Sequence, residues 1–188
     1  MERRPVVGVM GSGTRPWRER AGPLGALLAR MGVHLLTGGG GGVMAAVSEA
    51  FVAVRPRAGL VLGVLPCVEG DPRCAPPPGY PNPWVEVALA THLPHSGERG
   101  TEMTSRNHVN VLSSDVLVAL PGGAGTASET RLAVRYGRPV VAWLERPEEL
   151  PGRAPEVVVA ASLAEVEVFL RGSIPNPGQA PASKPPGR

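Results

Sequence analysis

Three apolar runs in this chain are each followed directly by a glycine-rich turn, and this repeated arrangement restricts the fold more than any other feature. The clearest case is residues 115–120, a near-continuous branched apolar run that is typical of a strand buried on both faces of a parallel sheet. Residues 122–125 form its turn, and the other two turns lie at 11–13 and 38–42. Because ligands bind beyond the carboxyl ends of the strands in open α/β sheets, the three turns are expected to meet at one ligand-binding edge.

Strand-like runs alternate with helix-like segments along most of the chain. Helical spacing of apolar or polar residues occurs at 17–31, 43–54, 100–113 and 126–136. The alternation predicts one α/β domain over residues 1–171, with a Rossmann-like, doubly wound and mostly parallel sheet covered by helices on both faces. Residues 172–188 are rich in proline, glycine and serine, and are expected to form a disordered tail.

Composition argues against several classes of function. The formal net charge is only +3, and three of the cations, Arg171, Lys184 and Arg188, lie in or beside the tail. The folded part is therefore close to neutral, so no nucleic-acid partner is expected. No apolar stretch reaches the roughly 18 residues that a membrane span needs, so no membrane partner is expected. The N-terminal residues lead directly into a strand-like run, which favours a cytoplasmic protein.

Residues 66–83 are rich in proline, glycine and charge, which indicates a long surface loop of the kind that often covers a functional site. Cys67 and Cys74 lie in this loop at a spacing that is not that of a zinc site or a thioredoxin motif. Two ordinary thiols, a disulfide or a redox pair all fit the pattern. His92 and His95 lack a third ligand at a suitable spacing, so no metal site is predicted.

The glycine-rich turns suit a phosphate group. Glycine lets main-chain N–H groups approach a ligand closely, and the start of a helix favours an anion. A tight turn with a helix cap explains the first turn equally well, and a flexible linker is an alternative for the second. The residues expected to bind a phosphorylated ligand are Gly11, Ser12, Gly13, Gly39, Gly40, Gly41, Gly122, Gly123, Ala124, Gly125 and Thr126.

Two motifs together resemble the LOG family, whose members are often mislabelled as lysine decarboxylases. The family's PGGxGTxxE motif matches residues 121–129, and the run Ser-Arg-Asn-His occupies 105–108. The resemblance covers about residues 5–170 and implies a Rossmann-like fold, a homodimer or homotetramer, and a nucleotide-like phosphorylated ligand. LOG enzymes hydrolyse the N-glycosidic bond of nucleoside 5′-monophosphates, releasing base and ribose 5-phosphate, and no cofactor is required. Their catalytic Arg and Glu correspond to Arg106 and Glu129.

The residues after Arg106 depart from the usual LOG enzyme, which has lysine at the next position. Here Asn107 and His108 follow, a pattern closer to the branch that includes the molybdenum cofactor carrier proteins. Those proteins bind a phosphorylated pterin and are not known as catalysts, so molybdenum cofactor is an alternative cargo and Asn107 is expected to contact the ligand. Lysine decarboxylation is excluded, because a pyridoxal phosphate enzyme needs a Schiff-base lysine and Lys184, in the tail, is the only lysine.

Arg106 and Glu129 have clear chemical roles if the protein is a hydrolase. A carboxylate can stabilise an oxocarbenium-like transition state or activate water, and arginine can hold a phosphate or ribose. Thr126 and Glu129 also match a helix capping box, and an isolated Arg106 is more often a solvated helix residue. The main prediction is a nucleoside 5′-monophosphate phosphoribohydrolase. The alternative is a non-catalytic molybdenum cofactor carrier, and a nucleotide sensor without turnover is a third hypothesis.

Overall fold

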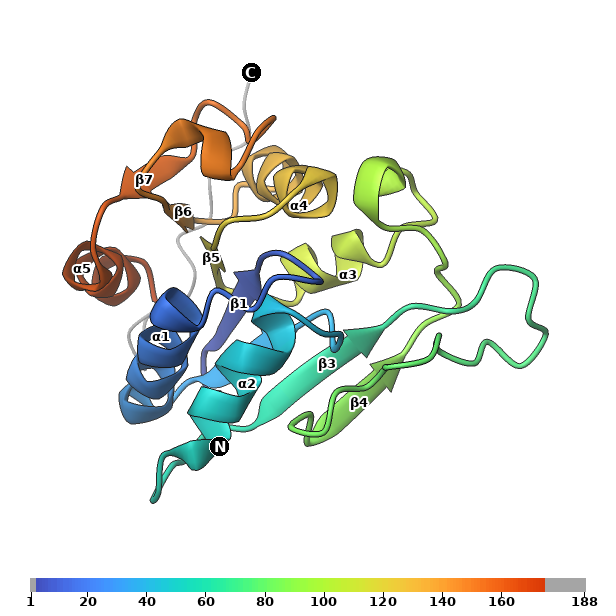
Figure 1. Ribbon diagram of the computed structural model, residues 1–188, viewed down its shortest axis with the longest axis horizontal. Coiled ribbons are helices and arrows are strands. Elements are labelled where there is room, and N and C mark those ends of the chain that lie inside the picture. Colours follow the sequence, from blue (N-terminus) through green and yellow to red (C-terminus); the bar gives the residue numbers. More distant parts are fainter. Residues whose placement is uncertain (1–2, 175–188) are drawn as a thin grey trace.

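The computed structural model describes residues 3–174, which form one seven-stranded sheet in the order β4-β3-β2-β1-β5-β6-β7 (Figure 1). Every neighbouring pair of strands is parallel. The α/β, doubly wound fold predicted from the sequence is confirmed, and its described sheet is parallel throughout. The strands are β1 (Val6–Met10), β2 (His34–Thr37), β3 (Val61–Leu65), β4 (Val87–Ala90), β5 (Val116–Ala119), β6 (Val140–Trp143) and β7 (Val158–Ala160).

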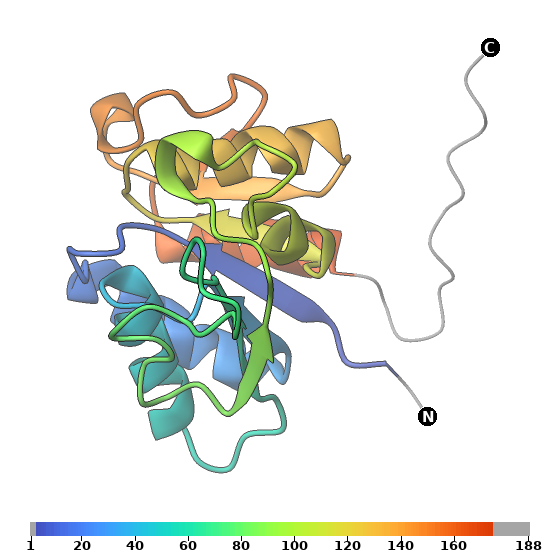
Figure 2. The same ribbon diagram turned by 90° about the vertical axis from the view of Figure 1, so that its right-hand side faces the viewer.

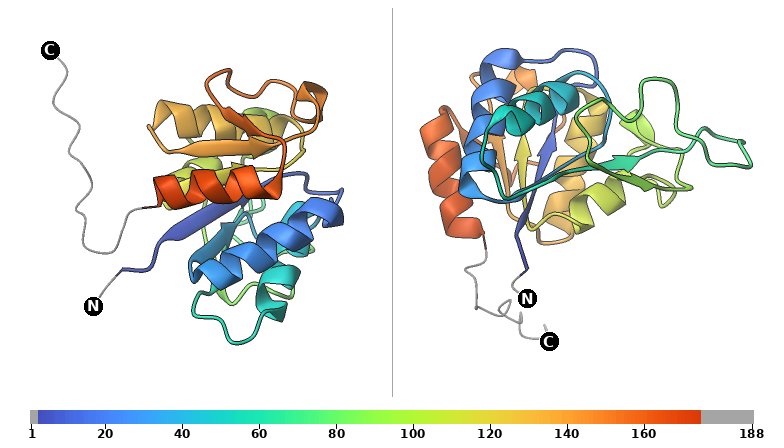
Figure 3. Two further views of the ribbon diagram at one scale, coloured as in Figure 1. Left: turned by 90° about the vertical axis from the view of Figure 1, so that its left-hand side faces the viewer. Right: turned by 90° about the horizontal axis from the view of Figure 1, so that it is seen from below.

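Helices cover both faces of the sheet (Figures 2 and 3). The α1, α2 and α5 helices pack on one face, and α3 and α4 pack on the other. Two short 3-10 helices lie in the connections. The bounds are α1 (Arg18–Met31), α2 (Val43–Ala53), α3 (Asn107–Leu112), α4 (Ala124–Arg135), α5 (Leu163–Ser173), η1 (Gly97–Arg99) and η2 (Pro147–Glu149).

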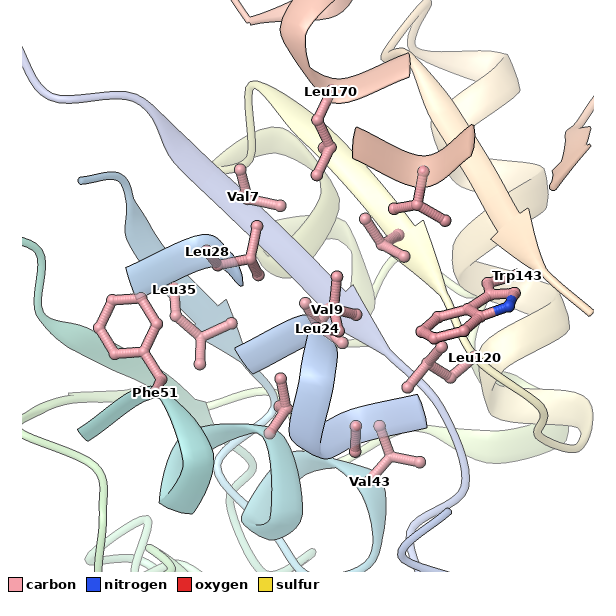
Figure 4. Packing of buried hydrophobic residues seen from close by; sticks show 14 of the residues in the cluster. Val7, Val9, Leu24, Leu28, Leu35, Val43, Phe51, Leu120, Trp143 and Leu170 are labelled. Atoms are coloured by element: carbon pink, nitrogen blue, oxygen red, sulfur yellow. The ribbon is translucent and has the colours of Figure 1, made fainter. Parts of the chain in front are cut away.

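Alternate residues of the central strands enter two separate hydrophobic clusters. In β5, Val116 and Val118 join the cluster under α1, α2 and α5, whereas Leu117 joins the cluster under α3 and α4. Figure 4 shows the first cluster, where Leu24 of α1 and Phe51 of α2 pack on the sheet. Because side chains of a strand alternate between faces, a sheet covered on both sides needs the continuous apolar runs seen in the sequence.

The helix predicted over 100–113 is wrong in its first half, since α3 begins only at Asn107. A β-bridge joins His95 to Ser105, and the His95 N–H donates to the Thr104 carbonyl. The backbone between them is therefore closed into a loop. The Ser105 hydroxyl then accepts the Asn107 N–H, so the helix starts after this turn.

Two other boundaries differ from the prediction. The α4 helix begins at Ala124, two residues before the expected start, because Gly123 takes the extended conformation of its N-cap. The α5 helix continues to Ser173, past the boundary predicted for the tail at residue 172. The rest of the predicted tail, from residue 175, lies outside the described residues.

Candidate functional site

The chain reverses its direction of winding between β1 and β5, which are hydrogen-bonded neighbours in the middle of the sheet. Connections from these two strands pass to opposite faces, and a crevice opens at their carboxyl ends. A cavity of about 340 Å³ lies at this edge. The predicted site residues that line it are Gly11, Ser12, Gly13, Arg106, Asn107, Gly123, Gly125, Thr126 and Glu129.

The structure places the other predicted glycine-turn residues, namely Gly39, Gly40, Gly41, Gly122 and Ala124, outside the lining of this cavity. Two of them show why glycine is present. A Cβ atom on Gly40 would come within 2.6 Å of the Tyr80 hydroxyl, and one on Gly122 would collide with the Thr126 side chain. These glycines allow the protein to pack closely on itself beside the cavity.

The first turn of α4, with its N-cap Gly123, lines one side of the cavity, and we call residues 123–126 the cradle. The first main-chain bond within the helix runs from the Ala127 N–H to the Gly123 carbonyl at 3.0 Å, so the N–H groups before it have no partner in the helix. A Cβ atom built on Gly123 would meet no atom within 4 Å. Main-chain donors with open space before them, at a helix start, are suited to a phosphate group.

Arg106 lies at the N-cap of α3 and is only 5% exposed. Its Nη1 donates to the carbonyl oxygens of Gly38 (2.9 Å) and Val64 (2.8 Å). Among the described residues its Nε has no hydrogen-bond partner, and its guanidinium carbon lies 5.7 Å from the centroid of the Tyr80 ring. A solvated helix arginine is therefore excluded. The guanidinium is fixed in the cavity wall by two strand-end carbonyls.

Glu129 lies in the second turn of α4 and is 8% exposed. Its Oε1 accepts a hydrogen bond from Asn110 Nδ2 at 2.8 Å. Burial raises the pKa of Glu129 to about 7, against the opposing effects of the Asn110 hydrogen bond and the positive charge of Arg106. The carboxyl group can thus donate or accept a proton near neutral pH.

The capping-box interpretation of Glu129 is wrong. Gly123 is the N-cap of α4, and no side chain makes a capping hydrogen bond there. Thr126 instead lies inside the first turn, where its side chain packs against Gly122. The carboxyl group of Glu129 is therefore directed to Asn110 of α3 rather than to the start of its own helix.

Asn107 connects the two helices that form this wall. Its Nδ2 donates to the Ser128 hydroxyl at 2.8 Å, and that hydroxyl donates to the Gly125 carbonyl at 2.7 Å. The chain of bonds holds the first turn of α4 against α3. Asn107 therefore lines the cavity and also fixes the position of the cradle.

Tyr80 is a cavity residue that sequence reasoning did not identify, although the long loop that carries it was expected to lie near a site. Tyr80 is the only aromatic residue in the sequence 66–83, and this could have marked it as a candidate residue for ligand contact. Asn82 fastens this part of the loop, because its N–H donates to the Gly39 carbonyl (2.8 Å) and its Nδ2 to the Gly40 carbonyl (2.9 Å). Other lining residues that were missed are Val9, Met10, Thr14, Gly38, Met44, Ser96 and Gly97.

His95 belongs to a charged cluster in the connection before α3. Its Nδ1 lies 3.1 Å from a Glu102 carboxylate oxygen and its Nε2 lies 3.4 Å from one of Glu69. Within residues 3–174, no group of three or more His, Cys, Asp or Glu side chains is placed to hold a metal ion. Over the same residues, no helix has both the length and the apolar character to cross a membrane.

Known proteins resemble this chain over most of its length. The chain is 30% identical to an uncharacterized protein of Archaeoglobus fulgidus over 166 residues, which cover 84% of this chain and 96% of that protein. It is similar to the molybdenum cofactor binding protein of the phototrophic bacterium Rippkaea orientalis, with 30% identity and a TM-score of 0.67 over 90% of this chain and 97% of that one.

The chain is also similar to the molybdenum cofactor carrier protein of Chlamydomonas reinhardtii. Its identity is 30% and its TM-score 0.62, over 90% of this chain and 99% of that chain. A more distant structure, the single-stranded-DNA-binding DNA processing protein A of Helicobacter pylori, shares 17% identity with a TM-score of 0.63, which shows the fold alone. The model of the SLOG cluster4 family matches residues 4–167. This chain therefore belongs to the SLOG cluster4 family.

Proposed function

We propose that this protein binds a phosphorylated pterin of the molybdenum cofactor type and carries it without turnover. The observation that carries the proposal is the 30% identity, over 90% of this chain, with a molybdenum cofactor binding protein and a molybdenum cofactor carrier protein. The site supports it with a fixed positive charge, because Arg106 Nη1 is held by the Gly38 and Val64 carbonyls in the cavity wall.

The phosphate is placed at the first turn of α4 in this proposal. The open space at Gly123 and the N–H groups of this turn that have no partner within the helix form the cradle. The helix dipole supplies only about 0.3–2 kcal/mol for an anion, so main-chain hydrogen bonds and the nearby positive charge of Arg106 must supply the remainder. The similarity to molybdenum cofactor binding and carrier proteins supports a pterin as the attached ring system.

A phosphoribohydrolase is the second candidate, and one observation favours it. Glu129 lines the cavity with a pKa of about 7, a value suited to general acid or base catalysis at neutral pH. In this scheme Glu129 activates water or stabilises the sugar cation while the cradle holds the 5′-phosphate. Asn110 holds one oxygen of Glu129 and leaves the other for the reaction.

One preparation distinguishes the two candidates. The protein is purified from cells that make molybdenum cofactor, unfolded in acid, and analysed for a fluorescent pterin and for molybdenum. A second portion is incubated with a panel of nucleoside 5′-monophosphates, and free base is measured by chromatography. We expect bound pterin and no base release. Base release that is lost in Glu129→Gln, without bound pterin, would contradict the carrier and establish the hydrolase.

A further inference from the structure

The two cysteines of the chain are neighbours in space within the segment 66–83. The Val68 N–H donates to the Ala75 carbonyl at 2.9 Å, which places side by side the two residues that directly follow Cys67 and Cys74. Two further turns tighten this arrangement, because the Asp71 N–H donates to the Val68 carbonyl and the Cys74 N–H to the Asp71 carbonyl. Neither thiol is in a disulfide.

The two thiols differ in accessibility. Cys67 is 6% exposed and its Sγ donates to the Val68 carbonyl at 3.2 Å, whereas Cys74 is partly exposed. Burial raises the pKa of Cys67, and the neighbouring Cys74 thiol raises it further. Cys74 also has a positive φ of 50°, an uncommon conformation for a residue other than glycine. An external reagent therefore meets Cys74 first, with Cys67 behind it.

Both ends of this segment are attached to the wall of the ligand cavity. At the N-terminal end, the Val64 carbonyl, three residues before Cys67, accepts the Arg106 hydrogen bond. At the C-terminal end, Asn82 is bonded to the Gly39 and Gly40 carbonyls, and Tyr80 lines the cavity. A crosslink between the cysteines would thus shorten the free part of a segment whose ends contact the site.

We propose that Cys67 and Cys74 form a reversible dithiol–disulfide site that stiffens segment 66–83, whose Tyr80 lines the cavity, with a low-molecular-weight disulfide such as glutathione disulfide as the oxidant. The Cys74 thiolate attacks one sulfur of the oxidant, forms a mixed disulfide and releases one glutathione thiolate. The Cys67 thiolate then attacks the Cys74 sulfur and releases the second glutathione. The protein dithiol loses two electrons and two protons, and the oxidant is reduced to two thiols.

The test uses the full chain without any ligand, so its outcome is independent of the proposed function. The protein is equilibrated in glutathione buffers of increasing oxidant fraction, and remaining thiols are trapped with a maleimide before intact-mass measurement. Hydrogen exchange is measured on the reduced and oxidised forms. We expect a species two hydrogens lighter that accepts no maleimide, and about tenfold slower exchange in peptides from segment 66–83, the effect of closing a short loop.

Single variants test the order of attack. Cys67→Ser is expected to retain glutathione on Cys74, because the resolving thiol is absent, and Cys74→Ser is expected to stay unmodified, because Cys67 is buried. Addition of a reductant must restore the original exchange rate in the wild type. Failure of the wild type to form the internal disulfide, or a disulfide that leaves exchange in 66–83 unchanged, would overturn the proposal.

Discussion

At the scale of single residues, Glu129 is the most informative group in the protein. It is a buried carboxyl beside a buried guanidinium, and the two side chains are separately held by Asn110 and by the carbonyls of Gly38 and Val64. Burial outweighs the favourable charge of Arg106, so the pKa of Glu129 rises to about 7 instead of falling. The cavity therefore contains an acidic group that is partly protonated at neutral pH.

The stability of the protein should depend on the protonation of Glu129. Its pKa is raised from 4.5 to about 7 by folding, so the folded protein keeps a proton that the unfolded chain loses between these values. The stability that this retained proton contributes to the folded protein is fully present below about pH 4.5, and it is lost as the pH rises through about 7. We expect Glu129→Gln, which stays neutral, to be more stable than the wild type at pH 8 by roughly 2–3 kcal/mol and similar to it near pH 4.5.

Urea denaturation of wild type and Glu129→Gln at the two pH values checks this expectation. Glu156→Gln, at an exposed position, is the matched control and should follow the wild type at both pH values. The account of Glu129 is wrong if its Gln variant keeps the pH dependence of the wild type.

At the scale of elements, the packing of α1 on α2 depends on Gly25. A Cβ atom there would collide with the Val47 carbonyl of α2, whereas one on Gly22, in the same helix, would meet nothing within 4 Å apart from its chain neighbours. Alanine is the better helix former by roughly 0.5–1 kcal/mol, so local propensity alone predicts that both glycines should be improved by it. The contact with α2 reverses the expected gain in stability at Gly25 but not at Gly22.

Gly25→Ala is therefore expected to destabilise the protein by about 1–3 kcal/mol, through overpacking between the two helices. Gly22→Ala is the control in the same helix and should change the free energy of unfolding by less than about 1 kcal/mol, because the gain in helix propensity is opposed by the contact of its Cβ with the adjacent Pro23. Thermal or urea unfolding of both variants measures the difference. Equal effects of the two substitutions would show that α1 and α2 are less closely packed than described.

The sequence allowed most elements to be predicted, because their apolar runs report directly on burial. The strand over 115–120 and the α2 helix were placed nearly correctly on this basis. The start of α3 was not, since it is set by the bridge between His95 and Ser105, a tertiary contact that periodicity does not record. The packing of Tyr80 on Gly40 could not be foreseen either, because it is also a tertiary contact. Several residues of the predicted glycine-rich turns do line the cavity.

At the scale of the whole molecule, the two edges of the sheet are exposed. All four residues of β4 are exposed, including Val87 and Leu89 at 36% and 40%. No helix lies between β3 and β4 along the chain, so the edge strand β4 lacks the helical cover that the central strands have. An exposed edge with apolar side chains is suited to association with another strand or chain.

We expect the protein to form a homodimer or homotetramer in which the β4 edge contacts a second copy of the chain. Leu89→Lys should then shift the mass measured by light scattering toward the monomer, because a charge would be buried in the contact. Val168→Lys, at an exposed apolar residue of α5, is the control and should leave the mass unchanged. A monomeric wild type, or dissociation by the control alone, would contradict this assignment.

The most direct measurement of the central claim is the amount of pterin and molybdenum released from wild type and from Gly123→Val after parallel purification. The open space at Gly123 accepts a side chain without a clash, so the variant should fold normally while its side chain occupies the cradle. Gly172→Val, at an equally open position in α5, is the control. We predict bound pterin in wild type and control and a loss of about tenfold or more in Gly123→Val. Equal pterin in all three proteins, or none in the wild type, would contradict the account.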